Sequence, residues 1–234
     1  MNVPDSNPNL AQLAVAAEKL TPLLNQIVFV GGCVTGLLVT DPAAAPIRPT
    51  LDVDAIVAVA SYAEYVALEK QLQELGFSPS LTEGAPICRW QHPSLILDLM
   101  PTDPSVLGFT NRWYGPAMVN AQRIEIEGHE IQIITAPYFV ATKLQAFHTR
   151  GKNGFQSSHD LEDIVTINDG RAELPEEIRA ASSEVRRYLS GEFQALLSNR
   201  DFIEALPGHL LSDAVSQQRL NLVTKRMQMI AAEE

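Results

Sequence analysis

The first 135 residues alternate apolar and polar positions or group them in short runs, a pattern typical of strands interleaved with helices. Asn9 predicts the N-cap of a helix that runs to Leu24. Ser61 predicts the cap of a second helix, which ends at Leu75 before Gly76. We expect strands at 27–30, 50–57, 77–82, 86–91 and 94–100, a hairpin over 121–134, a short helix at 33–39 and an irregular segment at 106–118.

The pattern changes after Pro137, where helical periodicity replaces alternation. The predicted helices are 138–149, 159–169, 175–197 and 217–232. We therefore expect an α/β (α+β) protein with two parts. Residues 1–135 form a mixed sheet with flanking helices, and residues 136–234 form a helical lobe that completes a cleft.

Composition narrows the class of protein. The chain has 234 residues, 46% of them hydrophobic, and a formal net charge of −11. An acidic surface argues against broad, sequence-independent binding to nucleic-acid duplexes. Two cysteines without paired spacing, Cys33 and Cys88, argue against a disulfide framework or a zinc site. Residues 1–8 lack a signal pattern and no apolar run approaches ~20 residues, so we expect a cytoplasmic protein without membrane partners.

The most informative stretch is the predicted strand 50–57, which carries Asp52 and Asp54. Alternation along a strand places these two carboxylates on one face, with Val53 on the other. Two neighbouring carboxylates in an apolar run are costly unless a cation neutralises them, and a divalent ion such as magnesium is the direct remedy. The alternative is that both aspartates lie at a solvated strand end beside a turn.

Two further features extend this interpretation. Gly31 and Gly32 stand between a strand and a helix, where the backbone can approach a phosphate; the alternative is a tight turn. Asp98 lies in the apolar strand 94–100, and a buried carboxylate there needs a partner. It either completes a three-carboxylate site for two metal ions or forms a salt bridge to Arg89 or Arg112.

Together these residues resemble the nucleotidyltransferase superfamily with the polymerase-β-like catalytic fold. The later stretches 141–146 (Ala-Thr-Lys-Leu-Gln-Ala) and 159–164 (His-Asp-Leu-Glu-Asp-Ile), with Arg150 between them, resemble the AbiEii-type toxins of type IV toxin–antitoxin systems. The resemblance covers about residues 27–167 and keeps the motifs in the family's order.

The resemblance implies a role for each matching residue. Gly31 and Gly32 approach the nucleotide phosphates, and Cys33 follows them where the family often has Ser or Thr. Asp52 and Asp54 hold magnesium. Asp98 orients a metal ion or deprotonates the acceptor hydroxyl.

In the second half, Lys143 contacts a triphosphate oxygen, and Asp160 lies beside it and positions the lysine or the acceptor. The alternatives are a solvated helix-face lysine and a first-turn acid favoured by the helix dipole. Glu162 and Asp163 would then belong to the exposed face of the same helix. Lys143, Arg150 and Lys152 form a basic cluster that could receive triphosphate or an RNA end. The alternative is that they form a solvated helix face.

The implied activity is metal-dependent transfer of a nucleoside monophosphate from a triphosphate such as ATP to an acceptor hydroxyl. The acceptor would be a tRNA end or a protein, and an antitoxin protein would be a partner. Cys33 and the long 41–49 loop motivate an alternative, a non-catalytic module that binds a nucleotide or a partner. A third possibility is transfer to an aminoglycoside, a cationic substrate that would suit the acidic charge.

Overall fold

The computed structural model describes residues 7, 9–59, 61–150 and 154–233. They divide into two compact units. The sheet unit comprises residues 7–36 and 48–135, and the helical unit comprises residues 37–47 and 136–234. Residues 37–47 therefore belong to the unit formed mainly by the second half of the chain.

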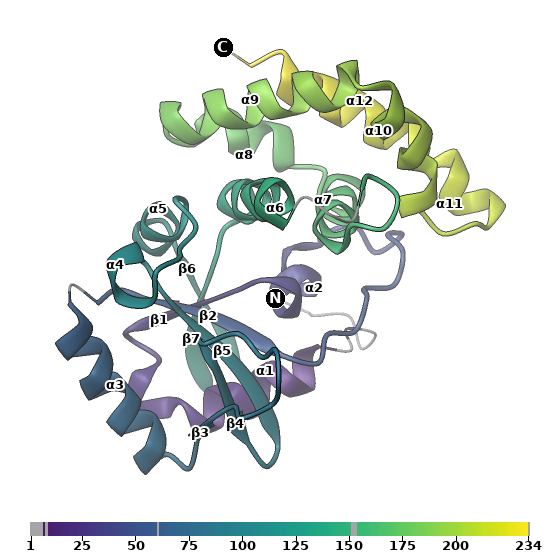
Figure 1. Cartoon of the computed structure of the whole chain (residues 1–234). Coiled ribbons are helices and arrows are strands. Elements are labelled where there is room, and N and C mark those ends of the chain that lie inside the picture. Colours follow the sequence, from purple (N-terminus) through teal and green to yellow (C-terminus); the bar gives the residue numbers. More distant parts are fainter. Residues whose placement is uncertain (1–6, 8, 60, 151–153, 234) are drawn as a thin grey trace. The chain divides into compact units, whose positions relative to one another are not determined.

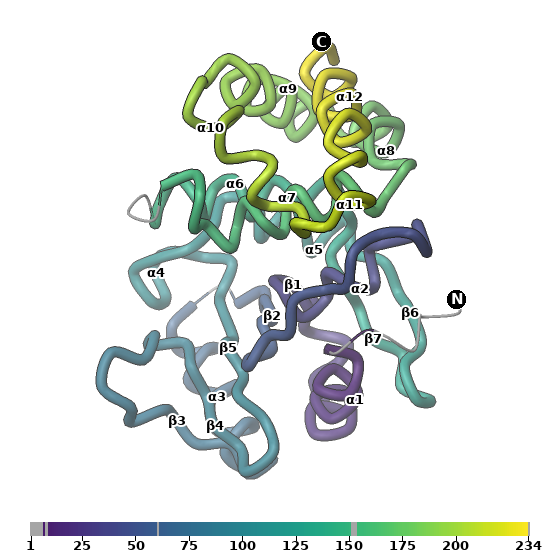
Figure 2. The backbone as a smooth tube through the Cα atoms, turned by 90° about the vertical axis from the view of Figure 1, so that its right-hand side faces the viewer, coloured from purple at the N-terminus to yellow at the C-terminus, as the bar shows by residue number. Residues whose placement is uncertain are grey.

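A seven-stranded mixed sheet forms the centre of the sheet unit (Figure 2), in the order β3-β4-β5-β2-β1-β7-β6. Its strands are β1 (Ile27–Val30), β2 (Val53–Val57), β3 (Ser78–Pro79), β4 (Arg89–His92), β5 (Leu95–Pro101), β6 (Gln122–Ile126) and β7 (His129–Ile133). The β2–β5 and β1–β7 pairs are parallel, and the other neighbours are antiparallel. The central strands β1, β2 and β5 are largely buried, and α1 (Leu10–Lys19) and α5 (Tyr114–Val119) contact strands of the sheet.

The helices of the sheet unit confirm most of the expected elements. They are α1 (Leu10–Lys19), η1 (Thr21–Leu23), η2 (Gly32–Val34), the start of α2 (Thr35–Leu38), α3 (Tyr62–Glu74), α4 (Pro104–Leu107) and α5 (Tyr114–Val119). The Ser61 side chain caps α3 by accepting a hydrogen bond from the Glu64 amide. Gly76 follows with φ of +88°, the left-handed conformation expected after a helix.

The first helix and the segment 106–118 differ from what we expected. The first helix ends at Lys19, and a short 3₁₀ helix takes the chain on to Leu23, because Pro22 interrupts the α-helical hydrogen bonding. The segment 106–118 is not irregular throughout, since α4 and α5 form in it. Asp103 caps α4 by accepting from the Ser105 amide, a local signal that sequence analysis overlooked.

The helical unit consists of α6 (Ala136–Arg150), α7 (His159–Gly170), α8 (Leu174–Ala180), α9 (Ser183–Ser198), α10 (Arg200–Ala205), η3 (Leu206–His209), α11 (Ala214–Gln218) and α12 (Leu220–Ala231). Within it α9 and α12 lie side by side, and α6 packs on α7 (Figure 1). The helix expected over 175–197 is in fact two, because the chain is extended at Ala181 and Ser182 caps a new helix. Among the described residues no helix has the length and apolarity to cross a membrane.

Candidate functional site

Asp52 and Asp54 both lie at the start of β2, but only Asp54 belongs to the strand. The strand begins at Val53, later than the predicted start at Thr50, and Asp52 lies in the bend before it. The Thr50 hydroxyl donates to the Asp52 carbonyl oxygen at 3.2 Å, which stabilises this bend. The two carboxylates are half-buried, so they lie at a strand end rather than inside the apolar run.

Parallel pairing brings Asp98 beside this pair. In the register of β2 and β5, Asp54 is the Cα partner of Asp98. Directly paired residues of neighbouring strands project from the same face of a sheet. The tertiary fold therefore gathers Asp54 and Asp98, as the carboxylate interpretation requires, although they are far apart in the sequence.

Arg89 is a cation that contacts this group. It is the Cα partner of Asp98 on the other side, in the antiparallel β4–β5 pair. Its Nε donates to Asp98 Oδ1 at 2.8 Å and its Nη2 to Asp98 Oδ2 at 2.7 Å, a bidentate pair. Nη2 also donates to Asp52 Oδ2 at 2.5 Å. Of the two salt bridges considered for Asp98, the structure forms the one to Arg89, and the Arg112 guanidinium lies 4.9 Å from the centre of the Trp113 ring.

The charge states follow from these contacts. The hydrogen bond to Asp98 raises the pKa of Arg89 above its ordinary value; burial acts against this, and the nearby charges of Asp98, Asp52 and Asp54 add to it. Burial raises the pKa of the neighbouring Cys88 thiol to about 12, and the charge of Asp98 adds to this effect. Arg89 therefore stays charged and Cys88 stays a neutral thiol near pH 7, which makes Cys88 unsuitable as a nucleophile.

The Gly31–Gly32 turn lies directly against Asp54. Gly31 has φ of +69°, a conformation that side chains disfavour, and a Cβ added there would overlap the Asp54 carboxylate. Glycine is thus required by both the backbone angle and the adjacent acid. This contact joins two of the predicted motifs, the glycine pair and the Asp-x-Asp strand, in one place.

Cys33 follows the glycine pair and lies in the 3₁₀ turn η2. Its side chain is fully buried, and Sγ lies 3.0 Å from the Val30 carbonyl oxygen. The thiol points into the core of the sheet unit and is not available to touch a phosphate. A small apolar side chain suits this position, because the 3₁₀ turn η2 packs it against β1 and β2.

Asn9 is a site-supporting residue that sequence analysis treated only as a helix cap. Its backbone is helical and its side chain does not cap α1. Instead Nδ2 donates to the carbonyl oxygens of Gly32 and Arg48, each at 3.2 Å, and Oδ1 accepts from the Thr50 amide at 2.9 Å. This fully buried amide therefore ties the glycine turn to the segment that leads to Asp52. No local sequence signal could have indicated these partners.

The three aspartates suit a hard divalent cation in ligand type, because all offer carboxylate oxygens. The register of Asp54 and Asp98 and the close approach of Gly31 agree with that chemistry. In the present conformation Arg89 bonds two of the three acids. Accordingly, the part of the chain that the structure describes contains no group of three or more His, Cys, Asp or Glu side chains arranged to hold a metal ion.

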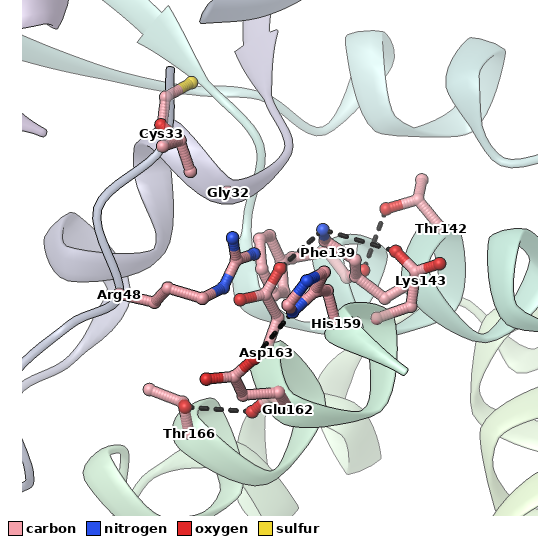
Figure 3. A network of polar contacts seen from close by, with 12 residues as sticks. Gly32, Cys33, Arg48, Phe139, Thr142, Lys143, His159, Glu162, Asp163 and Thr166 are labelled. Carbon is pink, nitrogen blue, oxygen red and sulfur yellow. Dashed lines mark hydrogen bonds and ion pairs between the residues drawn. The ribbon is translucent and has the colours of Figure 1, made fainter. Parts of the chain in front are cut away.

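A second acidic group lies in the helical unit, around Lys143 (Figure 3). Lys143 Nζ lies 2.6 Å from Asp163 Oδ2 and 3.4 Å from Asp160 Oδ1. Arg150 also reaches Asp160, at 3.3 Å. Helix α7 presents both aspartates on one face because they are three residues apart.

These contacts decide between the sequence alternatives for several residues. Lys143, Asp160 and Asp163 are largely buried, so none lies on a solvated helix face. Asp163 was expected only as part of an exposed helix face, although its spacing from Asp160 was a usable signal. Glu162 is half-buried and pairs with His159 at 2.9 Å. Lys152, the third member of the predicted basic cluster, lies outside the described residues.

Comparisons with known proteins bear on the fold. Neither protein-family models nor curated proteins gave a match to this sequence. Among solved structures, the chain is similar to an antigenic nucleotidyltransferase-like protein from Paracoccidioides brasiliensis. The TM-score is 0.52 at 20% sequence identity, over 86% of this chain and 93% of the other.

At this identity the likeness shows the fold alone. It bears on the architecture, and neither a superfamily nor the AbiEii type within it is shown by it. The mixed sheet followed by a helical region is the architecture expected from the sequence. The chain thus has an α/β fold like that of a nucleotidyltransferase-like protein.

Proposed function

We propose that this protein transfers a nucleoside monophosphate from a nucleoside triphosphate to an acceptor hydroxyl, with magnesium held at the start of β2. The observation that carries the proposal is the in-register pairing of Asp54 with Asp98, against the Gly31–Gly32 turn. A glycine turn that accepts phosphates and an adjacent acidic group that accepts metal are the two elements that nucleotide chemistry requires.

In the proposed reaction the acceptor oxygen forms a bond to the α-phosphorus, and the bond from that phosphorus to the bridging oxygen breaks. Pyrophosphate leaves, and the hydroxyl proton passes to Asp98 or to water. Asp52, Asp54 and Asp98 would hold magnesium ions, which neutralise charge on the phosphates and polarise the reacting oxygens. The contribution of the protein is then mainly positioning and electrostatic stabilisation.

Each remaining residue has a proposed part. The Gly31 and Gly32 backbone would approach the phosphates, and their lack of side chains makes that approach sterically possible. Lys143 would contact a triphosphate oxygen as a point charge, with Asp160 and Asp163 fixing its ammonium group. The acceptor would be an RNA end or a protein hydroxyl, as the AbiEii resemblance implies, and such a protein would act as the toxin of a toxin–antitoxin pair.

The test is magnesium-dependent incorporation from each of the four α-labelled nucleoside triphosphates, with total RNA and lysate protein as acceptors. We expect label in one acceptor pool, and none with the Asp52→Asn/Asp54→Asn variant. Glu125→Gln is the matched control, since it makes the same carboxylate-to-amide change at an exposed position of β6. Turnover retained by the double variant would rule out the metal role of these aspartates.

A second candidate function is nucleotide binding without transfer. The observation that favours it is the bidentate Arg89–Asp98 pair, which engages a proposed metal ligand. Nucleotide binding measured by calorimetry, together with no incorporation into RNA, protein or an aminoglycoside panel in magnesium or manganese, would support this candidate. Label in the aminoglycoside samples alone would instead indicate a small-molecule acceptor.

A further inference from the structure

Arg89 is held at the carboxylate group by its backbone as well as by its side chain. On one side the Ser80 amide donates to the Arg89 carbonyl oxygen at 2.9 Å, and on the other the Leu99 amide donates to the Cys88 carbonyl oxygen at 2.9 Å. Strand β4 thus fixes the Arg89 Cα opposite Asp98. The movable part of Arg89 is its long, flexible side chain, which is 25% exposed.

The guanidinium uses the oxygens that a metal ion would need. It takes both carboxylate oxygens of Asp98 and one of Asp52. Because the Asp98 side chain is only 10% exposed, its charge would be costly without a cation in contact. Arg89 supplies that cation from within the chain.

We propose that Arg89 is an internal counter-cation that competes with divalent metal ions for Asp52 and Asp98, so that metal binds only as this side chain is displaced. The inference rests on the proposed metal site and adds its regulation. The guanidinium donates to both oxygens of Asp98 and so leaves fewer lone pairs for a divalent ion, and the two positive charges repel each other at short range. The partial exposure of Arg89 gives the displaced guanidinium access to water.

This arrangement has a consequence for the protein without metal. The acidic group is neutralised in part by Arg89, so folding does not depend on a divalent ion. Metal affinity is correspondingly low in the absence of nucleotide, because the ion must displace an existing bidentate pair. A nucleotide that brings its own phosphate oxygens would favour the displacement.

The decisive experiment measures Mn²⁺ binding by electron paramagnetic resonance, without nucleotide, in wild type and Arg89→Met. Methionine keeps much of the apolar stem and removes the charge. We expect the Kd for Mn²⁺ to fall at least about tenfold in Arg89→Met. Arg123→Met is the matched control, since Arg123 is also an arginine of this sheet paired with a carboxylate, Glu130, but lies on β6 at the far edge. Its Kd should equal that of wild type.

The outcomes separate this inference from the proposed function. An equal Kd for Mn²⁺ in wild type and Arg89→Met overturns the proposed competition by Arg89. If Asp54→Asn loses Mn²⁺ binding in the same experiment, the proposed metal site is still supported. An equal tightening in Arg123→Met also overturns it, since only general charge would then matter. Mn²⁺ binding that is unaffected by Asp54→Asn rejects the metal site and the inference together.

A second measurement uses the wild-type protein and does not depend on the folding of a variant. The Arg89 Nε proton, donated to Asp98 Oδ1, gives an assignable side-chain signal in ¹⁵N-edited NMR spectra. Titration with Mg²⁺ should shift or broaden this signal, and the midpoint of the change should equal the midpoint of Mg²⁺ binding. The corresponding Arg123 signal should stay unchanged. A stationary Arg89 signal at saturating Mg²⁺ overturns the proposal.

Arg89→Lys keeps the charge but loses the bidentate geometry. Its Kd for Mn²⁺ should fall between those of wild type and Arg89→Met.

Discussion

Both units of this protein hold aspartates against basic side chains, yet the two groups differ in charge balance and exposure. In the sheet unit, Arg89 contacts two of three neighbouring aspartates; Arg89 and Asp52 are partly exposed, and Asp98 is buried. In the helical unit, Lys143 and Arg150 face Asp160 and Asp163, and the two acids are buried.

The difference separates two uses of the same side chains. Lys143, Asp160 and Asp163 are largely buried, so their ion pairs contribute to stability, since loss of one member leaves a buried charge. In the sheet unit, Asp52 and Asp54 are half-buried at the strand end beside Asp98, and the three carboxylates offer ligand oxygens that a divalent ion can take. We therefore expect mutations to affect activity most in the sheet unit and stability most in the helical unit.

The largest expected effect is on activity in the sheet unit. Asp54→Asn should lower incorporation roughly 10³-fold, because the amide keeps the shape but removes a charged ligand. Its melting temperature should stay within a few degrees of wild type, as measured by circular dichroism. If Asp54→Asn lost stability in proportion to activity, Asp54 would contribute mainly to stability. The contrast drawn between the two units would then be wrong.

The next effect is on stability in the helical unit. Asp163→Ala should lower the free energy of unfolding by about 2–3 kcal/mol, because it leaves the buried Lys143 ammonium with the longer contact to Asp160. Urea denaturation measures this change. Glu162→Ala is the neighbouring control, and its half-exposed pair with His159 should be worth under about 1 kcal/mol. Similar losses in both variants would contradict the role assigned to burial.

A variant of Asn9 tests whether the aspartates of the sheet unit also depend on the hydrogen bonds that hold the neighbouring backbone in place. Asn9→Ala removes three hydrogen bonds to the backbone of residues 32, 48 and 50, and should cost about 1–3 kcal/mol for the groups left unsatisfied. We also expect a loss of incorporation measured well below the unfolding temperature, since the glycine turn and the Asp52 bend are no longer joined. Full activity in a destabilised variant would show that Asn9 serves stability alone.

The smallest effect concerns pH in the helical unit. The hydrogen bond from Arg219 holds the pKa of Asp41 below its ordinary value of 3.8, with a further contribution from the Ala43 amide. A lowered folded-state pKa means that Asp41 stabilises the fold above its unfolded pKa and loses that contribution as pH falls through the folded value. Asp41→Asn should therefore show a flatter decline of stability below about pH 4 in acid titrations followed by circular dichroism. An unchanged acid profile would contradict this assignment.

Local sequence determined much of this protein. A short continuous apolar run specified β1, alternating apolar residues specified the hairpin of β6 and β7, and Ser61 and Gly76 marked the ends of α3. The glycine pair after β1 and the aspartates beside β2 were identified as a candidate site on residue type and spacing. These features could be predicted because each depends on neighbours within a few residues, through side-chain periodicity, capping and backbone freedom.

Tertiary structure alone decided what those residues contact. The pairing of Asp54 with Asp98, the bidentate bonds from Arg89 and the three hydrogen bonds of Asn9 join segments that are distant in the sequence. The inward direction of the Cys33 thiol likewise follows from how η2 packs on β1 and β2. Strand order and register arise from the burial of the whole core, so a carboxylate recognised in the sequence acquires its partners only when the sheet is assembled.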